Sequence, residues 1–567
     1  MKYICQTWEE RYDGILFFIQ RLQEMLFHYA DDVVKAPIHN TSSLIKEYKK
    51  TRDDLTIKQY HLDIIKTELI SSLKDDMVAQ KVLGEVCFRQ MLKSLNSTPN
   101  ETIDYLSRLI DERIYYNETT NMLLKALLDN DDKDKISSLL RKWISSTVFF
   151  GYDPEYVYHY LHELFDCPVD DPKNTIIEFF DNFNLTLRQY RVYFKFHGSM
   201  DKYKTLLSER LNISFSDDGY FDNLKMKRND FAGYMDIEAT NPSSAKNIEF
   251  RNLGIFTSFY IALTNETGKL VKNNCMVRDL LSNKLTFHTL KENGFKSIKS
   301  SSNSIDQVID TIVLSIQNKE GSYEIINKIV RLHNNGIIQN DLDDGFVNLW
   351  SVLEVACVNK KDKSKINAVT KKVVPILQND FFDVYFEVIC NELHTILGLD
   401  SYQDLLESID IDNEKPACKI AALCLIEKYN DVYDDLMKQL GQYPNVRYKL
   451  EKINKLKSSR KKLIALSNSY AERVRWHLYR LYRVRNLIVH DGETNRNIHI
   501  LGQHLHIYCD RVLIELLTKL STHKYLQTID DVFFETNSIV NYKLEHFNSK
   551  EAVSIEDIYV LFSDEFE

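Results

Sequence analysis

The chain has 567 residues, 44% of them hydrophobic, and a net charge of −10 at pH 7. This length predicts about three or four domains with ample apolar residues for buried cores, and no apolar run approaches the roughly 18 residues of a membrane span. The start of the chain does not resemble a signal peptide, no phosphate-binding loop motif occurs, and the nine cysteines are scattered without a CxxC pair. We therefore expect a cytoplasmic protein with reduced thiols that uses no membrane, no cofactor and no metal.

Residues 1–145 have helical periodicity throughout, and we interpret them as an N-terminal helical domain. Polar linkers at residues 96–100 and 129–132 separate the helices. The predicted helices are Trp8–Ala30, Ser42–Ser72, Met77–Leu95 and Thr102–Leu128.

The pattern changes between residues 146 and 300, where we predict a small α+β middle domain that acts as a sensor. Val192, Phe194 and Phe196 alternate with Arg191, Tyr193 and Lys195, which is typical of a half-buried strand. The elements expected after it are a helix at Lys202–Arg210, strands at Asn212–Phe215 and Gly233–Ala239, and a helix at Ser243–Thr264. His159 and His162 have a helical metal-ligand spacing but no third histidine nearby, so no metal site is expected there.

Residues 310–525 again have helical patterns and form the third predicted domain. A helix containing Trp350 and Glu354 opens it, and the helices expected next are Lys365–Val374, stopped by Pro375, then Asp383–Leu397 and Lys419–Leu440. The chain is thus predicted to be mainly α, with a helical N-terminal region, a small α+β middle domain and an all-α C-terminal domain.

A long helix is predicted from about Val446 to a stop at Gly492, and its second half is strongly basic. Glu472 is the only acidic residue between positions 455 and 485, against ten basic residues: Lys455, Lys457, Arg460, Lys461, Lys462, Arg473, Arg475, Arg480, Arg483 and Arg485. Aromatic residues such as Tyr482 interleave them. This pattern fits either a surface that binds RNA, with Arg475, Arg480, Arg483 and Tyr482 as contacts, or a solvated helix face.

The end of this helix combines Arg485, Asn486 and His490. Arginine offers a permanently charged fork of donors for a phosphate, and histidine exchanges a proton near neutral pH. Asn486 and His490 are four residues apart and share a helix face, whereas Arg485 and His490 diverge by roughly 140° on an α-helix. The alternative is that Arg485 pairs with a carboxylate and His490 merely interacts with the helix C-terminus.

The sequence from Arg485 to His490 resembles the motif of the HEPN superfamily, an arginine followed four to six residues later by a histidine. The segment Asp343–Glu354 is similar to the tryptophan-and-glutamate helix that opens Apea-like HEPN domains, which are associated with abortive infection. Some HEPN toxins carry a tyrosine at the position of Gly492, so modification of the chain there is not expected. The resemblance covers roughly residues 310–525.

This resemblance implies a metal-independent endoribonuclease whose catalytic residues are Arg485, Asn486 and His490. It also implies a homodimer with two motifs facing one cleft, RNA as the substrate, and a role in anti-phage defence in which residues 1–300 sense a phage-derived trigger or restrain the nuclease. The alternative is a non-catalytic RNA-binding or dimerising scaffold that keeps the HEPN fold.

Residues 526–567 form an acidic C-terminal extension. Its acidic residues outnumber Lys543 and Lys550, and they include Asp530, Asp531, Glu556, Asp557, Asp564, Glu565 and Glu567. Two alternatives remain open: a solvated extension, and an internal counter-charge lying against the basic helix.

Overall fold

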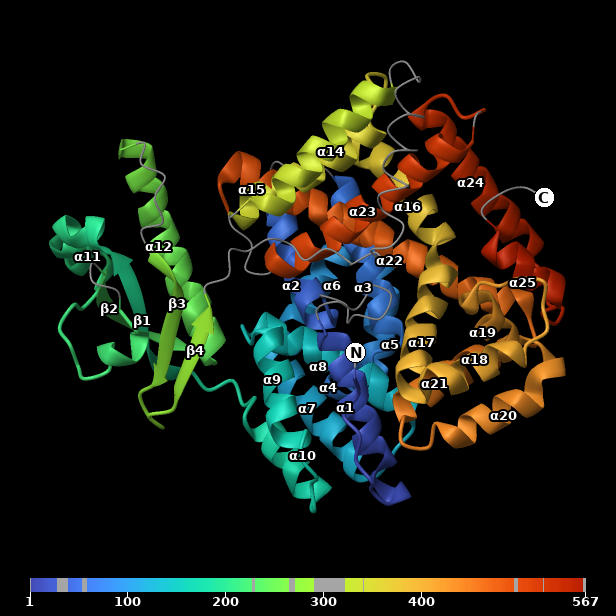
Figure 1. The fold of residues 1–567 in the computed structure, drawn as a ribbon, viewed down its shortest axis with the longest axis horizontal. Helices are drawn as coiled ribbons and strands as arrows, with labels where there is room; N and C mark the ends of the chain where they lie inside the picture. The colour runs from blue at the N-terminus through green and yellow to red at the C-terminus, as the bar shows by residue number, and fades with distance from the viewer. Residues whose placement is uncertain are drawn as a thin grey trace. The chain divides into compact units, whose positions relative to one another are not determined.

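The computed structural model describes residues 2–27, 39–53, 59–226, 230–264, 271–289, 322–339, 341–493, 498–523 and 525–563. It is mainly helical and contains one four-stranded antiparallel sheet in the middle region (Figure 1). This confirms the predicted fold class. Among the described residues, no helix is both long and apolar enough to cross a membrane.

The chain divides into two compact units that are not continuous in sequence. Unit 1 contains Met1–Ala36, Leu44–Leu109 and Asn293–Glu567, and unit 2 contains Pro37–Ser43 and Ile110–Glu292. The predicted boundary at residue 145 therefore falls inside unit 2, and the predicted N-terminal and C-terminal domains share unit 1. Amphipathic periodicity shows which face of a helix is buried but not which helix covers it.

Unit 2 begins with helices packed around the buried Trp143. These are α7 (Glu112–Leu128), α8 (Lys133–Phe149), α9 (Pro154–Phe165) and α10 (Pro172–Asp181). The rings of Phe180 and Phe183 meet the Trp143 ring edge-on, each with its centroid 5.4 Å away. Aspartates at positions 111, 132, 153 and 171 cap the four helices by accepting backbone N–H groups.

The sheet of unit 2 has the strand order β2-β1-β3-β4. The strands are β1 (Arg188–His197), β2 (Asp230–Ala239), β3 (Val271–Asp279) and β4 (Leu285–Thr289). Val192 pairs with Met235 of β2 and with Val277 of β3. Its face of the sheet is covered by α11 (Lys204–Leu211) and α12 (Pro242–Thr264), as Figure 1 shows for α12.

The predicted alternation in β1 is confirmed, and so is the strand at Gly233–Ala239. Val192, Phe194 and Phe196 are buried on one face, while Tyr193 is buried on the other against Phe221. The predicted strand Asn212–Phe215 is wrong, since only a single bridge between Ser214 and Tyr234 forms there. Strands β3 and β4 were not predicted, because polar residues such as Asn273 and Asn274 interrupt the alternation.

Unit 1 starts with the short 3-10 helix η1 (Glu10–Tyr12) and then six α-helices. They are α1 (Asp13–Leu26), α2 (Thr41–Asp53), α3 (Gln59–Lys74), α4 (Met77–Leu83), α5 (Glu85–Ser97) and α6 (Pro99–Leu109). The helix predicted at Met77–Leu95 is divided at Gly84, whose φ of 75° no right-handed helix contains. The predicted helix at Thr102–Leu128 is likewise divided, since Asp111 caps α7.

The remaining elements of unit 1 are helical. They are α14 (Ser322–Ile338), α15 (Leu342–Cys357), α16 (Lys365–Asn379), α17 (Phe381–Leu397), α18 (Leu399–Glu407), α19 (Pro416–Leu425), α20 (Asn430–Gln439), α21 (Pro444–Asn454), α22 (Arg460–Asn486), α23 (Ile498–Thr522), α24 (Ile529–His546) and α25 (Ile555–Phe562). The parts of predicted segments at residues 28–30, 54–58, 310–321 and 564–567 lie outside the described residues.

Three predicted helices in this part have wrong boundaries. The helix predicted at Lys419–Leu440 is divided, since α19 ends at Leu425 and α20 begins at Asn430. Pro375 does not stop α16, because the missing N–H removes one hydrogen bond while Val373, Val374 and Leu377 around it remain buried. The helix predicted from Val446 onward is interrupted between Asn454 and Arg460, so α21 and α22 are separate.

The acidic tail is not a solvated extension, since α24 and α25 pack into unit 1. Ile539, Ile558 and Leu561 are each 1% exposed. The Oδ2 atom of Asp557 accepts a 2.6 Å hydrogen bond from Nε of Arg460 at the start of α22, and Oε2 of Glu551 accepts one of 2.8 Å from Nη1. The counter-charge alternative is therefore correct for the first turn of α22.

Candidate functional site

The candidate site lies where α22 ends. Leu463, Tyr470, Val474, Leu478 and Leu481 recur at helical spacing and are buried, which fixes the helix against its neighbours. Directly after Asn486 the chain forms one π-helical turn, η5 (Leu487–Asp491), and Gly492 ends it in the left-handed conformation at φ 63°. The predicted stop at Gly492 is confirmed, and it depends on a residue that adopts positive φ without a steric penalty.

The π turn changes the geometry expected for the motif. In a π turn the backbone N–H bonds to the carbonyl five residues earlier, as Gly492 does with Leu487. Residues five apart therefore come closer to one side of the helix than the roughly 140° separation of an α-helix allows. Such turns are frequent at functional sites.

The three motif residues differ in exposure. Arg485 and Asn486 are half-buried, and His490 is exposed. Nη1 of Arg485 donates a 3.2 Å hydrogen bond to Oδ1 of Asn486, while Nε of Arg485 is buried and makes no hydrogen bond within the described chain. No carboxylate of the described residues forms an ion pair with Arg485. Its guanidinium thus retains donors for an anionic ligand.

Helix α15, which carries the second segment singled out in the sequence, packs beside the motif. It contacts α22, η5 and α23. Nε1 of Trp350 donates a 2.8 Å hydrogen bond to Oε1 of Glu354, and Nζ of Lys365 lies 3.2 Å from Oε2. The Trp350 ring also packs on Tyr482, with the centroids 5.6 Å apart. The Trp350 helix and the motif helix, more than a hundred residues apart in sequence, thus pack against each other.

Arg480 and Arg483, predicted to contact RNA, are instead committed to carboxylates of the N-terminal helices. Both are only 6% exposed. Nη2 of Arg480 lies 2.6 Å from Oε2 of Glu68 on α3 and 2.8 Å from Oε2 of Glu47 on α2, and Arg483 also pairs with Glu47. Burial raises the pKa of Glu68, an effect that Arg480 opposes and the neighbouring Glu47 reinforces. In this conformation neither arginine reaches a phosphate.

The surroundings of Tyr482 and Arg475 also differ from those expected for a shared RNA-binding surface. The Tyr482 ring is half-buried and stacks on His61 of α3, with centroids 6.0 Å apart and planes inclined by 17°. Arg475 is exposed, and its Nη1 lies 2.7 Å from Oε1 of Glu472. Of the four predicted RNA contacts, only Arg475 lies at the surface.

Sequence reasoning did not identify Glu47, Glu68 or His61 as neighbours of this helix. Each lies on an ordinary amphipathic helix, and no spacing rule connects residues more than 400 positions apart. Lys50 on α2 adds a further link by pairing with Glu493, directly after the π turn. Helices α2 and α3 therefore contact the motif helix at several points.

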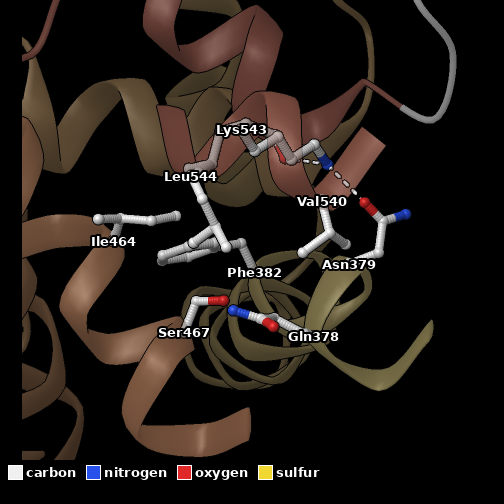
Figure 2. Close-up of a pocket in the computed structure, with 9 residues that line it drawn as sticks. Gln378, Asn379, Phe382, Ile464, Ser467, Val540, Lys543 and Leu544 are labelled. Carbon is white, nitrogen blue, oxygen red and sulfur yellow. Dashed lines mark hydrogen bonds between the residues drawn. The ribbon is translucent and has the colours of Figure 1, made fainter. Parts of the chain in front are cut away.

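A cavity of about 10 Å³ lies between α16, α17, α22, α24 and α25, where Nζ of Lys543 donates to Oδ1 of Asn379 at 2.9 Å and to the carbonyl of Leu561 at 3.0 Å (Figure 2). That volume is close to the lower limit for one water molecule, so the cavity is a packing defect of the core.

The chain matches no protein-family model, no curated protein and no solved structure. Its function is therefore inferred from the chemistry of the residues themselves.

Proposed function

We propose that this protein is a metal-independent endoribonuclease of the HEPN type that acts in the cytoplasm in anti-phage defence by abortive infection. The observation that carries the proposal is the arrangement of Arg485, Asn486 and His490 at the π turn that ends α22. Arg485 keeps a buried donor without a partner among the described residues, and His490 is open to solvent. The packing of Trp350 on Tyr482 supports a HEPN-like core.

In the proposed reaction the ribose 2′-hydroxyl attacks the neighbouring phosphorus atom. His490 accepts the proton of the 2′-hydroxyl, or donates one to the departing 5′-oxygen, and the P–O5′ bond breaks. The products are a 2′,3′-cyclic phosphate and a 5′-hydroxyl. Arg485 holds the phosphate and offsets the negative charge that develops on its oxygens, and Asn486 orients the Arg485 guanidinium through the hydrogen bond between them.

The contacts of α2 and α3 support a restrained enzyme. Glu47 and Glu68 neutralise Arg480 and Arg483, which lie five and two residues before Arg485. A polyanion would have to displace these carboxylates to use both arginines. We assign the N-terminal helices the role of restraint, and unit 2 the recognition of a phage-derived trigger.

The experiment compares wild-type protein with His490→Ala and Arg485→Ala on single-stranded RNA in the presence of a chelator. We expect cleavage that leaves a 2′,3′-cyclic phosphate, reduced on the order of a hundredfold or more in His490→Ala because the proton acceptor is lost. His159→Ala is the matched control, since His159 is an exposed histidine with 70% of its side chain accessible.

Cleavage that persists undiminished in His490→Ala, or that requires a divalent metal, contradicts the proposal. RNA binding without cleavage, both by the wild type and by a variant in which Glu47 and Glu68 are replaced by glutamine, favours the scaffold alternative. The ion pairs that Arg480 and Arg483 form with Glu47 fit such a scaffold, because both arginines then have a structural role.

A further inference from the structure

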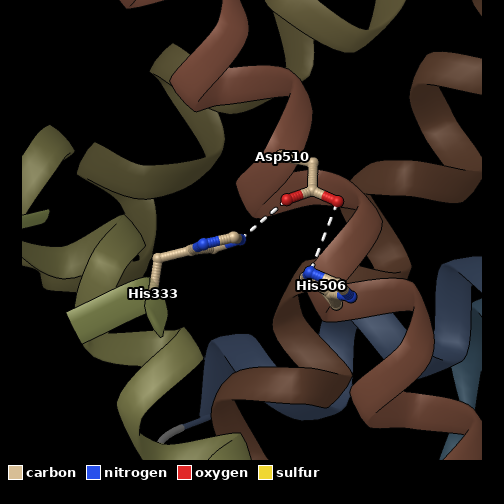
Figure 3. Close-up of side chains that lie close together, drawn as sticks. All are labelled: His333, His506 and Asp510. Atoms are coloured by element: carbon tan, nitrogen blue, oxygen red, sulfur yellow. Dashed lines mark hydrogen bonds and ion pairs between the residues drawn. The ribbon is translucent and has the colours of Figure 1, made fainter. Parts of the chain in front are cut away.

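Helices α14 and α23 bring together two histidines and an aspartate. Nε2 of His333 on α14 donates a 2.7 Å hydrogen bond to Oδ1 of Asp510 on α23, and Nε2 of His506 lies 3.3 Å from Oδ2 of the same carboxylate (Figure 3). The two imidazole rings have their centroids 5.2 Å apart. One ligand atom from each residue can be chosen so that all three lie within 4.8 Å of one another.

The residue types and their spacing suit a transition metal. His506 and Asp510 are four apart on α23, which places them on adjacent turns of one face. With metal–ligand distances of about 2.0–2.1 Å, the ligand atoms of a tetrahedral zinc site lie about 3.3 Å apart. The 3.3 Å separation of His506 Nε2 from Asp510 Oδ2 has that value, whereas His333 Nε2 contacts the other carboxylate oxygen, Oδ1, at 2.7 Å. The three ligand atoms lie within 4.8 Å of one another, so an ion would draw these side chains together by small shifts.

The burial of the three residues also suits a metal ion. The side chain of His506 is fully buried, whereas those of His333 and Asp510 are 12% and 19% exposed. The cluster is therefore held by the core on one side and reached by solvent on the other. Three protein ligands and one solvent position complete a tetrahedral shell, and imidazole with carboxylate matches zinc in ligand preference.

We propose that His333, His506 and Asp510 bind one zinc ion that holds α14 against α23. This site is separate from the proposed RNA chemistry, because it uses none of the motif residues and supplies no group to the reaction. Its effect is structural. Helix α15 packs on both α14 and η5, so an ion that fixes α14 also supports the helix beside the motif.

The test uses the full-length protein, freed of metal with a chelator and dialysed. The exposed Cys5 and Cys167 are replaced by serine in every sample, so that surface thiols do not bind the probe. Titration with zinc chloride in a calorimeter should show one ion bound per chain. His333→Gln and Asp510→Asn should each weaken binding about a hundredfold or more, since loss of even an outer-shell partner costs 10–100-fold.

The matched control is His162→Gln. His162 and Asp166 have the same spacing on α9 and a 2.8 Å contact, but they belong to no group of three metal-binding side chains within the described ranges. Zinc affinity should not change in this variant. Zinc should also raise the melting temperature of the wild type, and not that of His333→Gln.

Circular dichroism shows whether each variant is folded. Glutamine at position 333 retains a polar group of similar length, so we expect His333→Gln to fold. If Asp510→Asn loses its helical signal, the zinc affinity of His333→Gln alone tests the proposal. Absence of zinc binding by the wild type, or equal affinity in His333→Gln, overturns the proposal and leaves Asp510 as a carboxylate bridging two histidines. RNA cleavage is measured separately, so failure of the proposed nuclease does not affect this result.

Discussion

Arg480, Arg483 and Arg485 are close in sequence and have different surroundings in the structure. The first two share Glu47, and Arg480 also binds Glu68, so both guanidinium groups are neutralised inside unit 1. Among the described residues, Arg485 hydrogen-bonds to the Asn486 amide, and its buried Nε makes no hydrogen bond there; the same is true of the buried Nη1 of Arg483. Arg480 and Arg483 must release a carboxylate before they can bind a phosphate, whereas Arg485 has no carboxylate partner among the described residues.

The sequence allowed the motif residues to be identified but not their neighbours. Arginine, asparagine and histidine at this spacing suggest phosphate chemistry from their functional groups alone. The partners of Arg480 lie 433 and 412 residues away, and nothing local to either segment indicates that pairing. The π turn was not predicted either, because it differs from an α-helix by one residue in the hydrogen-bond pattern.

Asp557 provides a prediction at the residue scale. Its side chain is fully buried and accepts hydrogen bonds from Arg460 of α22, His546 of α24 and the backbone of Ser554. Burial alone would raise the pKa of Asp557, but these hydrogen bonds outweigh it and the pKa is lowered. The carboxylate therefore stabilises the fold above the unfolded pKa of about 3.9, and this contribution is lost as the pH falls through the folded value.

We expect Asp557→Asn to lower the free energy of unfolding by about 1.5–3 kcal/mol at pH 7, the scale of a hydrogen bond to a charged group. The same difference should hold at pH 5 and shrink below about pH 4, because the unfolded wild-type chain then binds a proton at Asp557 before the folded protein does. Urea unfolding at pH 7, 5 and 3 measures it. A difference that stays constant down to pH 3 contradicts the assignment.

At the scale of elements, helical periodicity identified most helices and failed at their ends. The helix predicted from Val446 was expected to continue past Leu463, yet α21 ends at Asn454 and α22 begins at Arg460. Tertiary contacts fix this break, since the backbone N–H groups of Arg460 and Lys461 bond to the carbonyls of Glu551 and Ser549. Such contacts are invisible in a local pattern.

Helices α2 and α3 give a prediction about restraint. We expect the Glu47→Gln/Glu68→Gln double variant to bind single-stranded RNA about tenfold more tightly, because Arg480 and Arg483 lose their carboxylate partners. Two additional phosphate contacts should steepen the dependence of log affinity on log salt by about 1.4. Fluorescence anisotropy at several salt concentrations measures both quantities.

The control for this variant is Asp104→Asn, which breaks another ion pair of α2. Asp104 binds Arg52 through two 3.0 Å hydrogen bonds and lies on α6. Its replacement should leave RNA affinity and salt dependence unchanged. An unchanged salt dependence in the folded double variant would show that Arg480 and Arg483 have a purely structural role.

At the scale of the whole molecule, unit 1 is closed by contacts between the start of the chain and helices α17 and α21. Glu24 of α1 pairs with Lys449 of α21 at 2.6 Å, and Lys449 also pairs with Glu392 of α17. The hydroxyl of Tyr3 donates a 2.6 Å hydrogen bond to Glu392. Burial opposes the charge of Glu24, but the ion pairs with Lys449 and Arg21 lower its pKa. The first helix is thereby an integral part of the C-terminal fold.

A shared-cleft nuclease requires a dimer, and the structure limits which apolar residues are free to form it. Leu501, Leu505 and Leu516 of α23 are buried within the chain, whereas Val489 beside the motif is 46% exposed. We expect a dimer at micromolar concentration in sedimentation, weakened at least tenfold by Val489→Glu, which buries a charge in the interface.

Leu281→Glu is the matched control, because Leu281 is 83% exposed and belongs to unit 2. It should leave the sedimentation profile unchanged. A wild-type protein that remains monomeric while cleaving RNA at its full rate would contradict the shared cleft and leave each motif acting alone.

The contact of α2 and α3 with α22 has a consequence for the order of synthesis. Glu47 and Glu68 precede Arg480 by 433 and 412 residues, so at about 5–20 residues per second a ribosome completes them roughly 20–90 s before that arginine. The acidic partners are therefore present before the motif helix leaves the ribosome. Under the proposed function, the ribosome makes the restraining helices α2 and α3 before it makes the motif helix α22. The cell that produces the protein therefore never contains α22 without the carboxylates of Glu47 and Glu68.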